Sequence, residues 1–580
     1  MQHGITTIPH FFRNAVKAFP NEVFIQKIIR EKLVTKTYKE SLEIVEKVTQ
    51  YLLNSGIKKY DRVAIVASNS LEWAFTYLGV VSFGAIVVPV DRTLPIQEII
   101  HILKFSEVKS VFGNITNIKD ILDYKDEIPQ ASLYVNLTLS EEYEGVINFE
   151  EIVESDFETI DYELPDLENL ASIIFTSGTT GLAKGVELTH RNFCSDILWT
   201  MGLIEIDETD CVYLILPMNH VFAFTAGFLG AIYAGCSITC ARSYRPNEIL
   251  EDIKNTKVTF FLGVPLLFDK ILTGMDKKIA EKGFITKAFV KTSLITSKIL
   301  KETFDSDAGA KLFKSLREKT GLASVRLFVS GGAPASVETV ERYNLMGFKF
   351  IQGYGLTETA PVVTINSKAY YKIGSIGPAI PNVQVKIMNP NRNDVGEIWV
   401  KGDIVMKGYY KNKEATDQVI TEDGWFKTGD LGFIDEEGYV FIKGRSKDVI
   451  ITSGGKNVYP EEIEFKLSRS PYILEAIVRG IPDQISSGEI IEALIVPDYE
   501  YFEEYLLHSK PGLGDEIIRE SIRKEIYKVN EKLPAYKRIK DFQIREEEFE
   551  KTSTKKLKRY LYKWNPIKIG DFKNKKNKKP

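Results

Sequence analysis

The stretch ASIIFTSGTTGLAKGV, from Ala171 to Val186, joins an apolar run to a loop of hydroxyl side chains, glycines and one lysine, Lys184. Glycines let backbone amides approach an anion, hydroxyl groups donate hydrogen bonds to it, and the lysine adds positive charge. The Walker A pattern GxxxxGK[ST] does not fit, because Ala183 and Gly185 occupy two of its four fixed positions. The loop therefore predicts phosphate binding, but of a kind other than that of P-loop enzymes.

Short apolar runs alternate with helical stretches on both sides of this loop. Continuous apolar runs that end in Gly or Pro are typical of parallel sheets covered on both faces, which predicts an α/β fold. The runs are RVAIVAS (62–68), AIVVPV (85–90), VTFFLGVP (258–265), VRLFVSGGAP (325–334) and FKFIQGYG (348–355). Ligands gather at the carboxyl ends of such strands. Because Thr176, Ser330 and Gln352 each follow an apolar run, we expect their loops to converge.

The length of 580 residues is too great for one core, so we expect at least two domains. We predict a large domain over residues 1–443, with a helical insertion at about 269–325, and a hinge at 444–448. A small α+β domain follows over 449–560, and a basic tail over 561–580. From Lys551 to Pro580 the sequence has twelve Lys or Arg residues against a single acid, Asp571. A solvated tail is the expected structure, and contact with an anionic membrane or with RNA is the alternative.

The composition is that of an ordinary globular protein, with a net charge of −4 that gives no reason to expect a nucleic-acid partner. The four cysteines lack metal-ligand spacing and are expected to be buried free thiols in a reducing cytoplasm. No signal peptide is recognised at the N-terminus.

Residues 211–241 carry no formal charge, but Pro217 and several glycines interrupt them, so strand, loop, buried helix and strand are expected there rather than a membrane span. The expected location is cytoplasmic, and peripheral contact at the inner membrane face through the basic tail stays open as the alternative.

Four motifs occur in a fixed order: TSGTTGLAKGV, GYGLTET (353–359), TGD (428–430) and GRSKD (444–448). With them, the sequence from about Phe11 to Tyr560 resembles the adenylate-forming (AMP-binding) superfamily of acyl-CoA synthetases, aryl-CoA ligases, luciferases and peptide-synthetase adenylation domains. The resemblance is strongest to long-chain fatty acid–CoA ligases. It implies a large N-terminal domain of stacked β-sheets flanked by helices and a small mobile C-terminal α+β domain. It also implies ATP and CoA as substrates and Mg²⁺ as cofactor.

The resemblance assigns the nucleotide site residue by residue. The loop through Lys184 would hold the outer phosphates, Tyr354 would pack on adenine, and Asp430 would accept hydrogen bonds from the ribose hydroxyls. Thr357 would contact the α-phosphate, and Glu358 would hold Mg²⁺, a cation that prefers carboxylate oxygens. The implied ATP or AMP contacts are Thr176, Ser177, Gly178, Thr179, Thr180, Gly181, Gly331, Gly332, Ala333, Gln352, Gly353, Tyr354, Asp430 and Arg445.

The family's last motif, Pro-x-Thr-x-x-Gly-Lys, is present only in part in EKTSTKKLKRY (550–560). Lys556 falls in register with the catalytic lysine, which places a cation between the substrate carboxylate and the α-phosphate. Glu550 and Lys555 replace the motif's Pro and Gly, so Lys555 stays open as the working residue. Lys447 aligns with the hinge about which the C-terminal domain turns between the two half-reactions. Gly454 and Gly455, in TSGGKN, would border the CoA tunnel.

The acid is predicted to be apolar, because no Asp or Glu occurs between Cys211 and Asn247, where amino-acid-activating relatives carry one. Candidate acyl-pocket residues are His220, Phe222, Phe224, Phe228 and Val264. The helical insertion resembles that of long-chain enzymes and favours a medium- to long-chain fatty acid. Acyl carrier protein in place of CoA, and a silent nucleotide-binding relative, stay open as alternatives, while the failed Walker A positions disfavour a P-loop NTPase. Chain length, thiol and oligomeric state are left undetermined.

Overall fold

The computed structural model describes residues 4–138, 142–176, 183–304, 308–367, 370–483, 488–505, 514–551 and 557–564. The chain forms two compact units. The first comprises Met1–Lys386, Trp399–Thr428 and Ile434–Phe441, and the second comprises Ile387–Ile398, Gly429–Phe433 and Ile442–Pro580. The predicted domain and hinge boundaries stay predictions.

One sheet of the first unit has eight strands, and its central strands are parallel. Strands β12 and β13 are buried along their whole length, as the continuous apolar runs predicted. Gly263 pairs with Ser330, and Ser330 pairs with Gln352, so β12 and β13 end side by side next to Gln352, beyond which β14 continues to Gly355. In spatial order the strands are β15 (Val362–Ile365), β14 (Lys349–Gly355), β13 (Leu327–Ser330), β12 (Phe260–Gly263), β10 (Cys211–Leu214), β11 (Ser237–Cys240), β1 (Val23–Ile29) and β2 (Lys32–Thr37).

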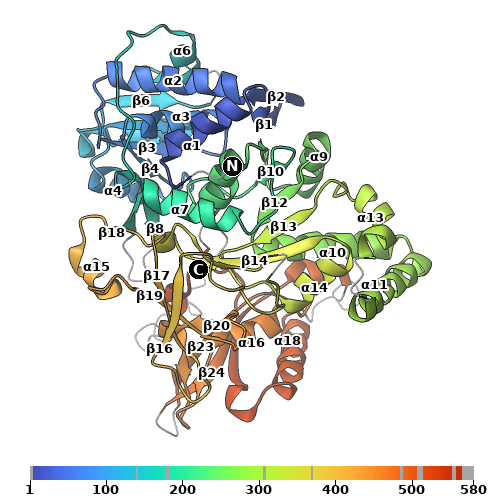
Figure 1. Ribbon diagram of the computed structural model, residues 1–580. Helices are drawn as coiled ribbons and strands as arrows, with labels where there is room; N and C mark the ends of the chain where they lie inside the picture. Colours follow the sequence, from blue (N-terminus) through green and yellow to red (C-terminus); the bar gives the residue numbers. More distant parts are fainter. Residues whose placement is uncertain are drawn as a thin grey trace, which may run out of the picture. The chain divides into compact units, whose positions relative to one another are not determined.

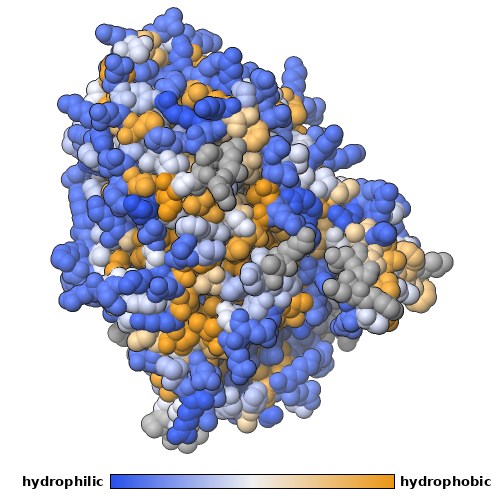
Figure 2. Space-filling model, in the orientation of Figure 1, coloured by the Kyte–Doolittle hydropathy of each residue, from blue (hydrophilic) through white to orange (hydrophobic). Residues whose placement is uncertain are grey.

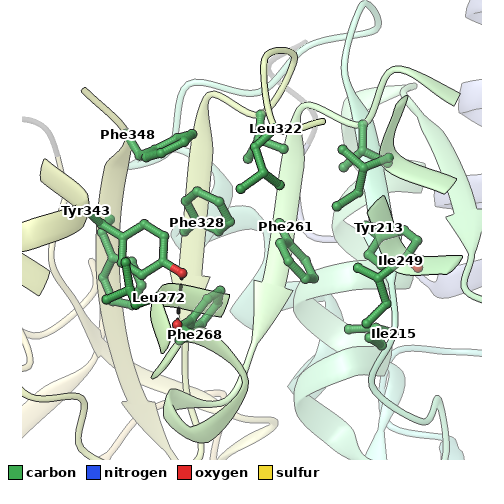
Figure 3. Close-up of a cluster of buried hydrophobic side chains, with 14 of the residues drawn as sticks. Tyr213, Ile215, Ile249, Phe261, Phe268, Leu272, Leu322, Phe328, Tyr343 and Phe348 are labelled. Atoms are coloured by element: carbon green, nitrogen blue, oxygen red, sulfur yellow. Dashed lines mark hydrogen bonds between the residues drawn. The ribbon is translucent and has the colours of Figure 1, made fainter. Parts of the chain in front are cut away.

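A dense aromatic core lies on one face of this sheet (Figure 3). Phe268 and Phe328 meet edge to face with ring centroids 5.5 Å apart, an arrangement that adds to simple area burial. The hydroxyl of Tyr343 donates to the carbonyl of Phe268 at 3.0 Å, so the polar group of this buried side chain is satisfied. The helices that supply much of this core are α9 (Pro246–Thr256), α10 (Pro265–Glu281) and α14 (Val337–Leu345).

The second eight-stranded sheet combines parallel strands with the antiparallel pairs β8–β9 and β9–β18. Helix α3 (Leu71–Ser82) is buried on every side, while α2 (Tyr38–Asn54) begins at a Thr37 capping box. The strand order is β18 (Gly408–Tyr409), β9 (Lys184–Thr189), β8 (Leu170–Thr176), β4 (Ile86–Pro89), β3 (Arg62–Val66), β5 (Ser110–Gly113), β6 (Leu133–Asn136) and β7 (Ile147–Asn148). Other helices of this part are α1 (Ile8–Ala18), α4 (Ile96–Phe105), α5 (Ile115–Leu122), α6 (Phe149–Glu154) and α7 (His190–Met201).

The uncharged stretch 211–241 forms β10, a π-helical segment over Ala223–Leu229, α8 (Gly230–Ala234) and β11, which confirms the predicted strand, loop, helix and strand. Its three cysteines and Cys194 are buried and unbridged, also as predicted. Among the described residues, no helix is both long and apolar enough for a membrane crossing.

Most of the described part of the stretch predicted as a helical insertion is helical, while residues 320–325 are not. Its helices are α10, α11 (Phe284–Phe304), α12 (Gly309–Leu312) and α13 (Lys314–Lys319). Figure 1 shows α10 and α11 beside α14, in the green and yellow part of the chain.

A third sheet of four strands contributes residues to both units: β16 (Gln384–Met388), β17 (Gly396–Lys401), β19 (Phe426–Ile434) and β20 (Val440–Arg445). Near it in the chain lies α15 (Lys413–Val419).

The second unit pairs β23 (Ile473–Pro482) and β24 (Glu489–Pro497) antiparallel, with β25 (Ile539–Ile544) parallel to β24. Helices α16 (Pro460–Leu467), α17 (Tyr499–Tyr505) and α18 (Gly514–Glu531) contribute to one core with this sheet. The hairpin β21 (Ile450–Ile451) and β22 (Asn457–Val458) completes the unit. An α/β chain with stacked sheets and a smaller α+β domain is therefore confirmed.

Candidate active site

The predicted phosphate-binding loop connects two paired strands, β8 and β9. Thr176 ends β8 and Lys184 begins β9, and the two residues are register partners. Ser177, Gly178, Thr179, Thr180 and Gly181, all predicted to bind phosphate, lie outside the described residues. The structure thus fixes where the loop leaves and rejoins the sheet.

The predicted adenine-side residues meet at the carboxyl edge of the first sheet. Gly331, Gly332 and Ala333 follow β13, while Gln352, Gly353 and Tyr354 lie on β14, its parallel neighbour. The side-chain oxygen of Gln352 accepts a hydrogen bond from the amide of Ala335 at 3.0 Å, which joins the two segments. Gly332 has φ +81°, a conformation that a residue with Cβ rarely adopts. The expected convergence is confirmed for the Ser330 and Gln352 loops, whereas Thr176 ends a strand of the other eight-stranded sheet.

Glu358 lies in a single 3₁₀ turn, Thr357–Thr359, that is held from two sides. Its carbonyl accepts from the amide of Met406 at 2.9 Å. Just beyond the turn, the carboxylate of Asp196 on α7 accepts from the amide of Val362 at 2.6 Å. Asp196 is fully buried, and burial raises the pKa of its carboxyl group well above the usual range. The backbone of the Glu358 turn is therefore fixed by groups from distant parts of the first unit.

Tyr409 on β18 joins two predicted site residues, a role that the sequence did not reveal. Its hydroxyl donates to Oε1 of Glu358 at 2.9 Å. The ammonium of Lys184 lies 4.8 Å from the centroid of its ring, within the range of a cation–π interaction. Tyr409 is buried and reaches Lys184 because β18 pairs with β9. One side chain thus holds the predicted phosphate-binding cation and the predicted metal-binding carboxylate beside each other.

The predicted acyl-pocket residues divide into two groups. Phe222 and Val264 are half-buried and pack against the core cluster beneath β12 and β13, and the Phe222 ring touches Gly331 so closely that a Cβ there would lie 2.9 Å from it. Phe224 and Phe228 are buried among other aromatic rings, including Trp73, and their contacts are those of core side chains. His220 precedes the π-helical segment and its carbonyl accepts from the amide of Phe224. The pocket assignment of all five stays a prediction.

In the second unit the structure brings Asp430 and Arg445 together. Nε of Arg445 lies 2.7 Å from Oδ1 of Asp430, whose side chain is 6% exposed. Lys447, the predicted hinge residue, is two positions further on, and burial lowers the pKa of its ammonium group. Gly454 and Gly455 form a turn in which the amide of Gly455 donates to the carbonyl of Thr452 at 2.8 Å.

Lys555 and Lys556 lie outside the described residues, but the chain on both sides of them is held in place. Lys551 pairs with Leu557 in an antiparallel bridge, and the amide of Lys558 donates to the carbonyl of Glu550 at 2.8 Å. Arg559 makes a two-pronged ion pair with Glu464 of α16, with Nη1–Oε1 at 2.7 Å. The lysine motif is therefore flanked by structured chain within the second unit.

Comparison with known proteins adds to this geometry. Residues 12–410 match the AMP-binding enzyme family and residues 462–556 match the AMP-binding enzyme C-terminal domain. A luciferin 4-monooxygenase of Photuris pensylvanica is 29% identical over 81% of this chain and 82% of its own length. A long-chain-fatty-acid–CoA ligase of Mycobacterium bovis is 28% identical over 85% of this chain and 82% of its own.

Among solved structures, an anthranilate CoA ligase in complex with anthranoyl-AMP superposes with a TM-score of 0.76 at 20% identity, covering 96% of each chain. At that identity the likeness establishes the fold. The four ordered motifs, the two family matches and the shared fold agree, so this chain belongs to the AMP-binding enzyme family, the adenylate-forming superfamily.

Proposed function

We propose that this protein activates a medium- to long-chain fatty acid with ATP and transfers the acyl group to CoA. The observation that carries the proposal is the meeting of Lys184 and Glu358 on Tyr409, because a cation and a carboxylate beside each other suit a metal-bound triphosphate. A long-chain-fatty-acid–CoA ligase among the relatives supports the choice of acid. A cytoplasmic location is part of the proposal.

The first half-reaction joins the acid to AMP. A carboxylate oxygen attacks the α-phosphorus, and the bond to pyrophosphate breaks with its electron pair going to pyrophosphate. Lys184 would balance the charge that gathers on the outer phosphates, and Lys556 would hold the carboxylate against the α-phosphate. Thr357 would donate to an α-phosphate oxygen, while Asp430 would fix the ribose through its hydroxyls.

Magnesium fits the residues present, because Glu358 supplies a carboxylate oxygen that the Tyr409 hydroxyl orients. When bound, the ion would neutralise charge on the phosphates. In the second half-reaction the thiolate sulfur attacks the acyl carbon, and AMP leaves with the electron pair of the broken C–O bond. Gly454 and Gly455 would let the thiol arm approach closely.

The direct test is a pyrophosphate-release assay with ATP, Mg²⁺ and fatty acids of graded length, run with CoA, with acyl carrier protein and with neither. Turnover with CoA that peaks at one chain length would support the proposal and identify its substrate. Turnover with carrier protein alone would transfer the function to the carrier-protein ligase. Nucleotide binding without pyrophosphate release would favour a silent relative.

The role of the lysine motif is tested by the two half-reactions separately. Lys556→Ala should abolish pyrophosphate release while leaving thioester formation from supplied acyl-adenylate largely intact, with Lys555→Ala as the matched control. Equal loss of both half-reactions in Lys556→Ala would contradict the assignment. The opposite ranking of the two variants would move the role to Lys555.

A further inference from the structure

Helix α11 packs on the rest of the first unit through two buried serines and two half-buried apolar side chains. Ser293 and Ser297 are buried on its inner face, and the hydroxyl of Ser297 donates to the carbonyl of Leu345 at 2.7 Å. Val290 and Leu294 pack against the core cluster from the same side. Four other apolar side chains of the helix lie on its outer face.

That outer face is apolar. Phe284 is 84% exposed, Phe289 64%, Ile295 52% and Ile299 53%. At 3.6 residues per turn, Phe284, Ile295 and Ile299 fall within about 60° of one another around the helix axis, and Phe289 lies about 80° beyond Ile299 on the side away from Phe284. Figure 2 shows orange side chains gathered at the right-hand edge, where Figure 1 places α11. Single exposed apolar residues are normal, but a row of them on one helix marks an interaction surface.

A row of lysines runs beside the apolar row. Lys287, Lys291 and Lys298 fall within about 40° of one another on the adjoining side of the helix, and Lys301 continues the row. The helix carries four lysines against one acid, Glu302, whose carboxylate lies 3.8 Å from the ammonium of Lys298. Positive charge therefore predominates along one edge of the apolar face.

We propose that this face of α11 docks the protein on the surface of an anionic lipid bilayer. An apolar row flanked by lysines is the arrangement of helices that lie in the interface plane, with rings and aliphatic chains among the acyl groups and ammonium groups at the headgroups. Long lysine side chains reach the headgroup level while their stems stay apolar. The lysine row is complementary to anionic headgroups, and this charge complementarity selects a bilayer as the occupant.

The proposal does not rest on the fatty acid–CoA ligase activity, and it is distinct from the membrane contact left open for the basic tail. Its test is flotation of the full-length protein with vesicles of phosphatidylglycerol and phosphatidylcholine in equal parts, and with phosphatidylcholine alone. We expect binding to the anionic vesicles that weakens as salt is raised, because screening acts on the lysine contribution.

Two multiple variants test the apolar row and the lysine row of α11 separately. Phe284→Ser with Ile295→Ser and Ile299→Ser should lower the bound fraction at least tenfold. Replacing the four lysines of α11 with Gln should lower it by a similar factor on anionic vesicles. All these side chains are exposed except that of Lys301, which is half-buried, so a nearly unchanged melting temperature is expected and serves as the folding check. Leu33→Ser with Val34→Ser, on the exposed part of β2, is the matched control and should bind like the unchanged protein.

Three outcomes would overturn the proposal. The α11 variants could bind vesicles as well as the unchanged protein does. Binding could be lost only when the lysines of residues 573–579 are changed to Gln, which would assign it to the tail. Finally, the unchanged protein could ignore vesicles yet self-associate in light scattering in a manner that the apolar variant abolishes, which would make the face a contact between copies.

Discussion

Tyr409→Phe should weaken Mg²⁺ binding in the presence of ATP while leaving the binding of metal-free ATP unchanged. The substitution removes the hydroxyl that donates to Glu358 at 2.9 Å but keeps the ring that Lys184 faces at 4.8 Å. A hydrogen bond to a charged group contributes about 1.5–3 kcal/mol, and because Glu358 is half-exposed we take the lower end, about 1.5 kcal/mol. At about 1.4 kcal/mol per factor of ten, the apparent Kd for the metal should rise about tenfold.

The assay is isothermal titration of Mg²⁺ or Mn²⁺ into the protein with ATP, together with titration of ATP in the presence of a chelator. Tyr410→Phe, at the next residue, is the matched control, and Tyr409→Leu removes hydroxyl and ring together. We expect Tyr409→Leu to weaken the binding of metal-free ATP as well, because the cation–π contact is then lost. An unchanged metal affinity in Tyr409→Phe, or an equal loss for ATP without metal, would refute the reasoning.

Three further predictions concern stability. Burial, with a smaller contribution from His10, lowers the pKa of His190 to about 3, whereas the unfolded chain protonates near 6.5. Unfolding free energy should therefore fall as pH drops from about 6.5 to about 3, by up to about 1.4 kcal/mol per pH unit. Unfolding free energies measured by urea titration at several pH values should depend less steeply on pH in His190→Gln than in the unchanged protein. Gly331→Ala should destabilise by about 1–3 kcal/mol by overpacking against Phe222, and a second change, Phe222→Leu, should restore part of it in the same denaturation assay. Arg559→Met should cost the second unit about 3 kcal/mol, because the carboxylate of Glu464 then loses its cation and, within the described chain, keeps only the hydrogen bond from the Val478 amide. Limited proteolysis of that unit should be faster in Arg559→Met than in the double variant Arg559→Glu with Glu464→Arg.

The central strands of the first sheet could be predicted from the sequence because strands buried on both faces consist of continuous runs of apolar residues. The convergence of Ser330 and Gln352 followed from the same runs, since parallel neighbours end at one edge. Sequence spacing placed Phe222, Phe224 and Phe228 together in the acyl pocket, but Phe224 and Phe228 contact each other as core side chains do. Spacing alone does not distinguish a ring that lines a cavity from one that fills a core.

The role of Tyr409 could not be predicted from the sequence, for a physical reason. Its partners are set by the pairing of β18 with β9 and by the position of the Glu358 turn, and neither has a local signal in the sequence. The family resemblance supplied residues that touch the nucleotide, whereas a side chain that touches those residues carries no motif of its own. Long-range pairing of this kind is visible only in three dimensions.

The two-sided hold on the Glu358 turn has a consequence for how the chain opens and closes. Two positions one turn apart on α7 act on it: Asn192 donates to the carbonyls of Asp403 and Val405, next to Met406, and Asp196 accepts from Val362. Helix α7 follows directly after β9, the strand that begins at Lys184. The ammonium of Lys184 and the carboxylate of Glu358 are therefore held by the same continuous segment of chain. Hydrogen exchange at the Val362 and Met406 amides should then require the opening of that whole body rather than local fraying. The geometry of the carboxylate is settled when the chain folds, before any ligand arrives.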